Sequence, residues 1–350
     1  TGGLGPTDDD NTKKAIVKVF KRNLIFHENI LEDMKARWAK RGIVMPAINH
    51  NQALLPQGAK FFPNKIGSAV GICISEEGRT FISLPGVPRE MEQILVDEVI
   101  PYLKGLNIGD SIKIVKLRTT GVVESKLADI LQADLKLESG VKLAYLPAYS
   151  GVDLRIIASG DKDDEALEKA RNLERFLNSA IGKYIYGKNG DTLQGVVGQL
   201  LIDNDKTLSV AESCTGGQLG MTVTAVPGAS SYFLGGVISY SNDAKMKELA
   251  VDESIIVEHG AVSEECAMAM AKGCRQKFES DYALAITGVA GPDGGTDEKP
   301  VGTAYIGLSS VHNTFARKFS FGNNREANRA RACYAALELL RRDILDLSLI

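Results

Sequence analysis

The chain has 350 residues, enough for two or three domains with cores of ordinary size, and its formal net charge of -3 provides no basic field for nucleic acid or membrane. Its five cysteines are odd in number and form no CxxC pair, which argues against a disulfide framework and a thiolate zinc site. We expect a protein of the reducing cytoplasm, because no signal peptide is predicted and no apolar run approaches the roughly 20 residues that span a bilayer.

The first predicted domain, residues 1–104, opens with the glycine-rich turn Thr1-Gly-Gly-Leu-Gly-Pro-Thr7. Such a turn normally follows a strand, so we expect the first βα units of this domain to precede Thr1. Asp8, Asp9 and Asp10 come next at the start of a predicted helix, where Asp9 and Asp10 are either Mg²⁺ ligands beside a bound phosphate or part of a solvated acidic helix start. The remaining pattern predicts helices over residues 11–20, 25–39 and 89–103, a loop over 45–52, and strands over 70–74 and 80–84.

Two loops of this domain carry a family resemblance. Residues 1–10 and the turn Leu84-Pro-Gly-Val-Pro-Arg-Glu-Met91 resemble the signature loops of the molybdopterin-binding (MoaB/MogA-like) domain, in the form found in CinA proteins. The resemblance implies a partial three-layer α/β domain. Because some members hydrolyse ADP-ribose with a divalent metal, it also implies Asp9 and Asp10 as ligands of a metal such as Mg²⁺.

The middle domain, residues 105–188, is predicted to be a small α+β module. Its expected order is strand 111–119, helix 124–131, a hairpin of strands 142–147 and 152–159, helix 163–181 and a short strand 184–186. In CinA proteins a domain at this place resembles a KH domain. RNA-binding KH domains clamp the RNA backbone with a GxxG loop, which residues 105–188 lack, so we favour a structural spacer over an RNA-binding module.

The third predicted domain, residues 189–350, alternates strands with helices, which indicates an α/β sandwich. Asp191 is expected to cap its first helix, and residues 257–263 are expected to form a loop. The predicted strands cover residues 208–211, 232–240, 282–286, 301–308 and 314–321, and the longest helix covers 324–347.

Polar residues follow three of these strands, at the strand ends where α/β proteins place ligands. The first group is the turn Val210-Ala-Glu-Ser-Cys-Thr-Gly-Gly217, which offers N–H groups to an anion or oxyanion, unless it is an ordinary helix cap. The second is Tyr240-Ser-Asn-Asp-Ala-Lys245, and the third runs from Thr287 to Gly295. Arg325 and Arg329 share one helix face and could clamp a phosphate.

These groups supply the parts that amide hydrolysis needs, namely a nucleophile, a base and an oxyanion site. Ser213 is the candidate nucleophile, and Cys214 is its rival. Lys245 can act as base if desolvation or a nearby cation such as Arg329 lowers its pKa. The alternative for both Lys245 and Arg329 is an ordinary exposed surface residue. The N–H groups from Thr215 to Gly217 could hold the oxyanion. His259 and His312 are other possible bases, but neither belongs to such a group.

The whole third domain resembles the CinA C-terminal family, the nicotinamide-nucleotide amidases. Five runs carry the resemblance in order: Ala211-Glu-Ser-Cys-Thr-Gly-Gly217, Ser239-Tyr-Ser-Asn-Asp-Ala-Lys245, His259-Gly-Ala-Val-Ser-Glu264, Thr287-Gly-Val-Ala-Gly-Pro-Asp-Gly-Gly295 and Glu298-Lys-Pro-Val-Gly-Thr303. The resemblance implies hydrolysis of nicotinamide mononucleotide to nicotinate mononucleotide and ammonia, without a cofactor, by a homodimer.

By motif position, the resemblance gives Ser213 the role of nucleophile and Lys245 that of base. It also places Tyr240, Thr215 and Arg329 at the catalytic site. The substrate-binding residues that it implies are Gly216, Gly217, Thr287, Gly288, Ala290, Gly291 and Arg325, with Arg325 a rival to Arg329 for the essential arginine.

Two other functions stay open at this point. The first domain could hydrolyse ADP-ribose, or the chain could be a non-enzymatic competence or repair scaffold that binds nucleotide or DNA. The near-balanced charge argues against nucleic acid as a partner.

Overall fold

The computed structural model describes residues 1–7, 9–106, 109 and 111–348, and these form two units, residues 1–109 and 110–350. Asp8, one of the three aspartates that follow the glycine-rich turn, lies outside the described residues. The first unit contains α1 (Thr12–Val19), β1 (Leu24–Phe26), α2 (Glu28–Lys40), η1 (Ala47–Ala53), β2 (Leu54–Pro56), β3 (Lys60–Phe62), β4 (Gly71–Glu76), β5 (Arg79–Ser83), α3 (Pro88–Ile94), η2 (Leu95–Val99) and α4 (Ile100–Gly105).

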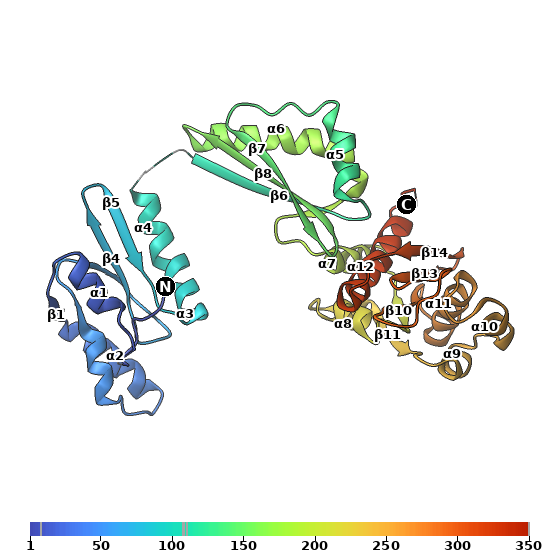
Figure 1. Ribbon diagram of the computed structural model, residues 1–350, viewed down its shortest axis with the longest axis horizontal. Coiled ribbons are helices and arrows are strands. Elements are labelled where there is room, and N and C mark those ends of the chain that lie inside the picture. Colours follow the sequence, from blue (N-terminus) through green and yellow to red (C-terminus); the bar gives the residue numbers. More distant parts are fainter. Residues whose placement is uncertain (8, 107–108, 110, 349–350) are drawn as a thin grey trace. The chain divides into compact units, whose positions relative to one another are not determined.

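In the first unit, β3, β4 and β5 form one antiparallel sheet, and β1 pairs with β2 (Figure 1). The predicted helix 25–39 is wrong at its start, because Leu24–Phe26 is extended and pairs with Leu54–Pro56, so that the helix begins at Glu28. This long-range pairing overrides the local helical pattern. The two signature loops contact each other: the Gly2 N–H donates to the Leu84 carbonyl at 2.9 Å.

The second unit begins with the small α+β module. It contains β6 (Ser111–Thr119), α5 (Glu124–Gln132), β7 (Val141–Ala148), β8 (Gly151–Gly160), α6 (Asp163–Ile181), η3 (Gly182–Tyr184) and β9 (Ile185–Lys188). The four strands form an antiparallel sheet in the order β7-β8-β6-β9, and the leucine-rich faces of α5 and α6 pack on it (Figure 1). The predicted order of strands and helices is confirmed.

The rest of the second unit is an α/β sandwich. It contains α7 (Leu193–Asp203), β10 (Leu208–Glu212), α8 (Gln218–Thr224), η4 (Ala229–Ser231), β11 (Phe233–Ile238), α9 (Asn242–Leu249), α10 (Glu253–His259), α11 (Glu264–Phe278), β12 (Tyr282–Gly288), β13 (Thr303–Ser309), β14 (Thr314–Ser320) and α12 (Arg325–Ile344). The strand order is β11-β10-β12-β13-β14, with β10 parallel to both β11 and β12 and the last two strands antiparallel.

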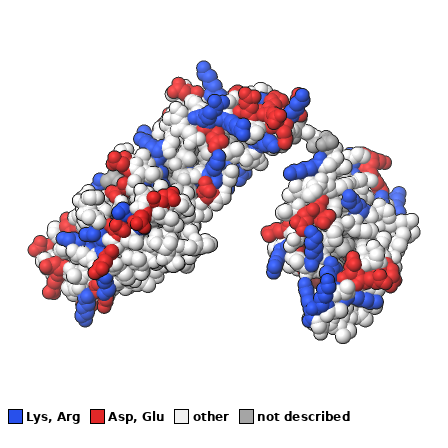
Figure 2. All heavy atoms as spheres, turned by 180° about the vertical axis from the view of Figure 1, so that it is seen from behind, with Lys and Arg blue, Asp and Glu red and all other residues white. Residues whose placement is uncertain are grey.

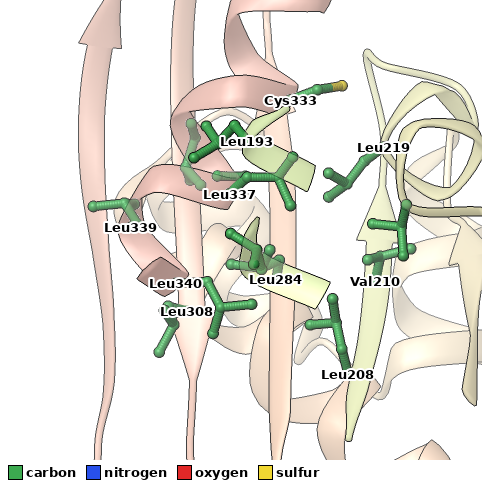
Figure 3. Close-up of a cluster of buried hydrophobic side chains, with 14 of the residues drawn as sticks. Leu193, Leu208, Val210, Leu219, Leu284, Leu308, Cys333, Leu337, Leu339 and Leu340 are labelled. Carbon is green, nitrogen blue, oxygen red and sulfur yellow. The ribbon is translucent and has the colours of Figure 1, made fainter. Parts of the chain in front are cut away.

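Alternation along the central strand β12 gives the two faces of this sheet different cores. Leu284 and Ile286 pack in the large aliphatic cluster with α7 and α12, part of which Figure 3 shows. Ala283 and Ala285 point to the opposite face and pack under α11. Small residues let α11 approach closely: a Cβ atom at Gly307 would lie 2.3 Å from the Ala267 carbonyl oxygen.

Two local predictions in this domain are wrong. Thr192, not Asp191, caps α7, because the Thr192 hydroxyl accepts the Gly195 N–H while the Asp191 carboxylate accepts the Lys188 N–H. The first residues of the predicted loop 257–263 are helical, because α10 extends to His259. Asp252 caps this helix by accepting the Ser254 N–H. Ser241 caps α9 and Ser263 caps α11, each through a backbone N–H three residues later.

Leu284→Ala is expected to destabilise the second unit by about 2–5 kcal/mol, because Leu284 is completely buried and its truncation leaves a cavity. The only tryptophan of the chain, Trp38, lies in α2 of the first unit. In urea, the far-UV circular dichroism transition should therefore move to lower concentration while the Trp38 fluorescence transition stays in place. Ile202→Ala, at an exposed position of α7, is the control. An unchanged dichroism transition in Leu284→Ala would contradict the prediction.

Candidate active site

Ser213 lies at the carboxyl end of β10, between the neighbouring strands β11 and β12. Its N–H continues the ladder by donating to the Ile286 carbonyl at 2.9 Å, so the backbone of Ser213 is fixed to the sheet. The chain then turns through Gly216 and Gly217, whose φ angles of 57° and 96° are in the left-handed region that favours glycine, and α8 follows. A short polar turn thus places Ser213 at the sheet edge where parallel strands end.

Lys245 reaches Ser213 from the first turns of α9. Its Nζ atom lies 3.0 Å from the Ser213 Oγ atom and 2.8 Å from the Ser239 carbonyl oxygen. Lys245 is 1% exposed and Ser213 8%, so this contact is shielded from bulk water. Within the described residues no carboxylate forms an ion pair with Lys245.

Burial lowers the pKa of Lys245 from its ordinary value. The predicted contribution of Arg329 to this lowering of the pKa is not seen, because desolvation is the cause of the lowering. A lowered pKa increases the fraction of neutral amine, which is the form that can accept the Ser213 proton.

Cys214 does not have the surroundings of a nucleophile. Burial raises the pKa of its thiol to about 11, so the thiolate is scarce near neutral pH. Cys214 lines a small hollow together with Thr303, Asn328 and Arg329.

Glu212 was not predicted as a site residue, yet its carboxylate organises the turn after Ser213. It is 1% exposed and accepts the N–H groups of Gly217, Leu219 and Gly220 at 3.0, 2.9 and 2.8 Å. A carboxylate at the last strand position before a glycine-rich helix start is the signal that could have revealed it.

This arrangement corrects the prediction for the oxyanion site. The Gly216 N–H donates to the Ser213 carbonyl and the Gly217 N–H to Glu212, so neither is available to an oxyanion. Among the hydrogen bonds of the described residues, the backbone N–H groups of Cys214 and Thr215 have no protein acceptor. They are the remaining donors directly after Ser213.

The two predicted arginines lie in the first turns of α12 and reach different loops. Arg329 donates to the Thr215 carbonyl at 2.6 Å, and its buried Nε has no partner among the described residues. Arg325 donates to the Gly291 carbonyl at 2.6 Å and contacts the Tyr240 hydroxyl at 3.4 Å. Both border an open depression that is also lined by Gly216, Gly217, Gln218, Met221 and Glu326.

The glycine-rich loop after β12 is held from two sides. The Thr287 hydroxyl is buried and donates to the Ala261 carbonyl at 2.6 Å, and Gly288 still pairs with Ala304 of β13. Asn328 donates to the Ala290 carbonyl at 3.0 Å and is 3% exposed. Asn328 is a second residue that sequence reasoning missed, because nothing in its surroundings in the sequence marks it.

Other predicted site residues lie elsewhere. The His259 ring lies beside Glu265, its carbonyl accepts the Lys299 amine, and His312 lies in the turn between β13 and β14. Asp9 and Asp10 belong to the first unit, where the Asp10 carboxylate accepts the N–H and hydroxyl of Thr7. In the part of the chain that the structure describes, no three metal-ligating side chains come together.

The fold and the buried serine–lysine pair define a multidomain α/β protein with a candidate serine–lysine site. Three family profiles match the chain: "CinA C-terminal domain" over residues 190–344, "Probable molybdopterin binding domain" over residues 1–105 and "Damage-inducible protein CinA KH domain" over residues 116–187. The chain belongs to the CinA family, whose members include the proteins described next.

A CinA-like protein of Gemmatimonas aurantiaca is 42% identical over 98% of this chain and 81% of its own length. A CinA-like protein of Cytophaga hutchinsonii is 39% identical over 99% of this chain and 83% of its own length. The crystal structure of the competence/damage inducible protein CihA from Agrobacterium tumefaciens is 32% identical and covers 43% of this chain and 95% of that protein, with a TM-score of 0.41. Of the helices described here, none combines the length and the apolar character needed to cross a bilayer.

Proposed function

We propose that the second unit hydrolyses the carboxamide of nicotinamide mononucleotide to nicotinate mononucleotide and ammonia. The observation that carries this proposal is the 3.0 Å contact between the Ser213 hydroxyl and the buried Lys245 amine. A serine hydroxyl is a weak nucleophile until a base accepts its proton, and a desolvated lysine is suited to that role. The nicotinamide specificity rests on the family resemblance of the surrounding loops.

In the proposed reaction, neutral Lys245 takes the Ser213 proton as Oγ attacks the carboxamide carbon. The N–H groups of Cys214 and Thr215 stabilise the resulting oxyanion. When the intermediate collapses, the C–N bond breaks, the Lys245 ammonium returns a proton to the leaving nitrogen, and ammonia departs. Lys245 then deprotonates a water molecule that attacks the acyl-serine, which releases the acid and restores the Ser213 hydroxyl.

The depression beside the turn suits the phosphate of a mononucleotide. Arg325 and Arg329 border it, and an arginine binds phosphate through paired charge-assisted hydrogen bonds. Tyr240, which is 62% exposed and contacts Arg325, and the loop around Gly291 remain candidate contacts for the nucleoside.

The test of the function is ammonia release from nicotinamide mononucleotide by the purified chain, with nicotinate mononucleotide identified by mass spectrometry. We expect stoichiometric formation of both products. Absence of both products at millimolar substrate would overturn the proposal.

Arg325→Ala is expected to raise KM for nicotinamide mononucleotide by about 10- to 150-fold, the value of a lost charge-assisted hydrogen bond. The wild type should prefer this substrate to nicotinamide riboside, which lacks the phosphate, and the variant should lose most of that preference. Arg331→Ala is the control, because the Arg331 guanidinium lies over the Tyr149 ring rather than in the depression. An Arg325→Ala enzyme that still discriminates between the two substrates would exclude a phosphate contact for this residue.

The alternative functions have weaker support. In the first unit no three metal-ligating side chains come together among the described residues, so no step of ADP-ribose hydrolysis is assigned to them, and that activity stays a prediction. On the face that Figure 2 shows, Lys and Arg side chains alternate with Asp and Glu, and this pattern does not favour a nucleic-acid surface.

A further inference from the structure

We infer that Glu212 is a positioning residue, whose carboxylate holds the turn that sets the Ser213 hydroxyl against Lys245. The inference rests on the proposed function, because it assigns Ser213 as the reacting group. It goes further by naming what keeps the nucleophile in place.

The first argument is the closed set of hydrogen bonds around the turn. Glu212 directly precedes Ser213, while its three donors, Gly217, Leu219 and Gly220, follow Ser213 in the chain. One side chain therefore ties the end of β10 to the start of α8, with Ser213 between the two. Neither half of the turn can shift without breaking bonds to a carboxylate that is 1% exposed.

The second argument is that Glu212 also supports the Lys245 side of the pair. Its backbone carbonyl accepts the Ser239 N–H at 2.8 Å, and the Ser239 carbonyl in turn accepts the Lys245 amine at 2.8 Å. The side chain of Glu212 thus fixes the turn after the nucleophile, and its main chain fixes the strand end that holds the base.

The third argument concerns charge. Among the ion pairs of the described residues, none involves Glu212, so backbone N–H groups at the start of α8 are its partners. The carboxylate thereby fills the anion-binding position that a helix start would otherwise offer to a substrate phosphate. A change to glutamine would keep one oxygen acceptor but place the amide N–H₂ against one or two of the three N–H donors, so the turn would have to move.

The test compares Glu212→Gln with Glu338→Gln. Glu338 is a matched control, because it is 2% exposed and hydrogen-bonded to Arg341 and Arg342 in the later turns of α12. Three quantities are measured on the full chain. They are kcat and KM for nicotinamide mononucleotide, and the rate at which a fluorophosphonate labels Ser213, followed by mass spectrometry.

We expect Glu212→Gln to lower kcat and the labelling rate by about 100-fold, the cost of displacing a reacting group by about 1 Å, with KM changed less than about threefold. Glu212→Asp should recover part of both rates, because it keeps the carboxylate. If Glu212→Gln does not fold, Glu212→Asp alone should show a smaller loss of the same kind.

Unchanged labelling in Glu212→Gln, or in Glu212→Asp if the former does not fold, would overturn the inference. An equal loss in Glu338→Gln would also overturn it, because the effect would then be general destabilisation. Labelling does not depend on the substrate, so a wild type that releases no ammonia but labels at Ser213 would refute the proposed function and still test Glu212.

Discussion

Ser213→Ala is expected to abolish ammonia release, with kcat reduced on the order of 10⁴-fold or more, as in other hydrolases that lose their nucleophile. The change removes the atom that lies 3.0 Å from the Lys245 amine. It leaves the backbone bond from Ser213 to Ile286 and the Glu212 hydrogen bonds in place, so the fold should survive. Stopped-time ammonia assays with matched circular dichroism spectra are the measurement.

Cys214→Ala is the control for this experiment. Because burial raises the pKa of the Cys214 thiol to about 11, its removal should leave most of the activity. If activity survived in Ser213→Ala and vanished in Cys214→Ala, the nucleophile would be the neighbouring cysteine and the mechanism would have to be rewritten.

Lys245→Met is expected to lower kcat by about 10²- to 10⁴-fold, the usual contribution of a positioned general base. Methionine retains much of the buried apolar volume but cannot accept a proton. Thermal unfolding should therefore change little, since Lys245 forms no carboxylate pair among the described residues that the change would break.

The pH dependence provides a second readout for the same lysine. Below its pKa the amine is protonated and cannot activate Ser213, so the wild-type kcat should rise with pH as Lys245 loses its proton. Burial lowers this pKa, so the rise should occur at lower pH than the ordinary lysine value of 10.5. The rising limb should be absent in Lys245→Met; a limb that persists there would assign the base to another group.

Much of this fold could be predicted because its elements carry strong local signals. The strand 111–119 and the helix 163–181 have the predicted bounds, since alternation or helical periodicity runs through their whole length. The short strand β1 and the helix α10 were missed. Strand β1 depends on pairing with residues about thirty positions later, and α10 has only seven residues.

Part of the candidate site could likewise be predicted from the sequence, and part could not. The sequence motifs marked Ser213 and Lys245, and the sheet brings them into contact. The sequence motifs could not show which backbone N–H groups of the turn remain available to an oxyanion, because that depends on which of them the Glu212 carboxylate accepts. Nor could they show that Asn328 holds the glycine-rich loop, since that contact joins positions 38 residues apart.

The last helix has a practical consequence for dissecting this protein. Its Arg341 side chain donates to the Lys183 carbonyl, and Tyr186 of β9 packs in the same aliphatic core as Leu337 and Leu340. A recombinant fragment cut at residue 189 would discard Lys183 and Tyr186, which would expose apolar side chains and remove the carbonyl acceptor of Arg341, leaving Glu338 as its remaining partner among the described residues. Expression of the C-terminal part alone should therefore start before β9, or solubility and yield will suffer for reasons unrelated to catalysis.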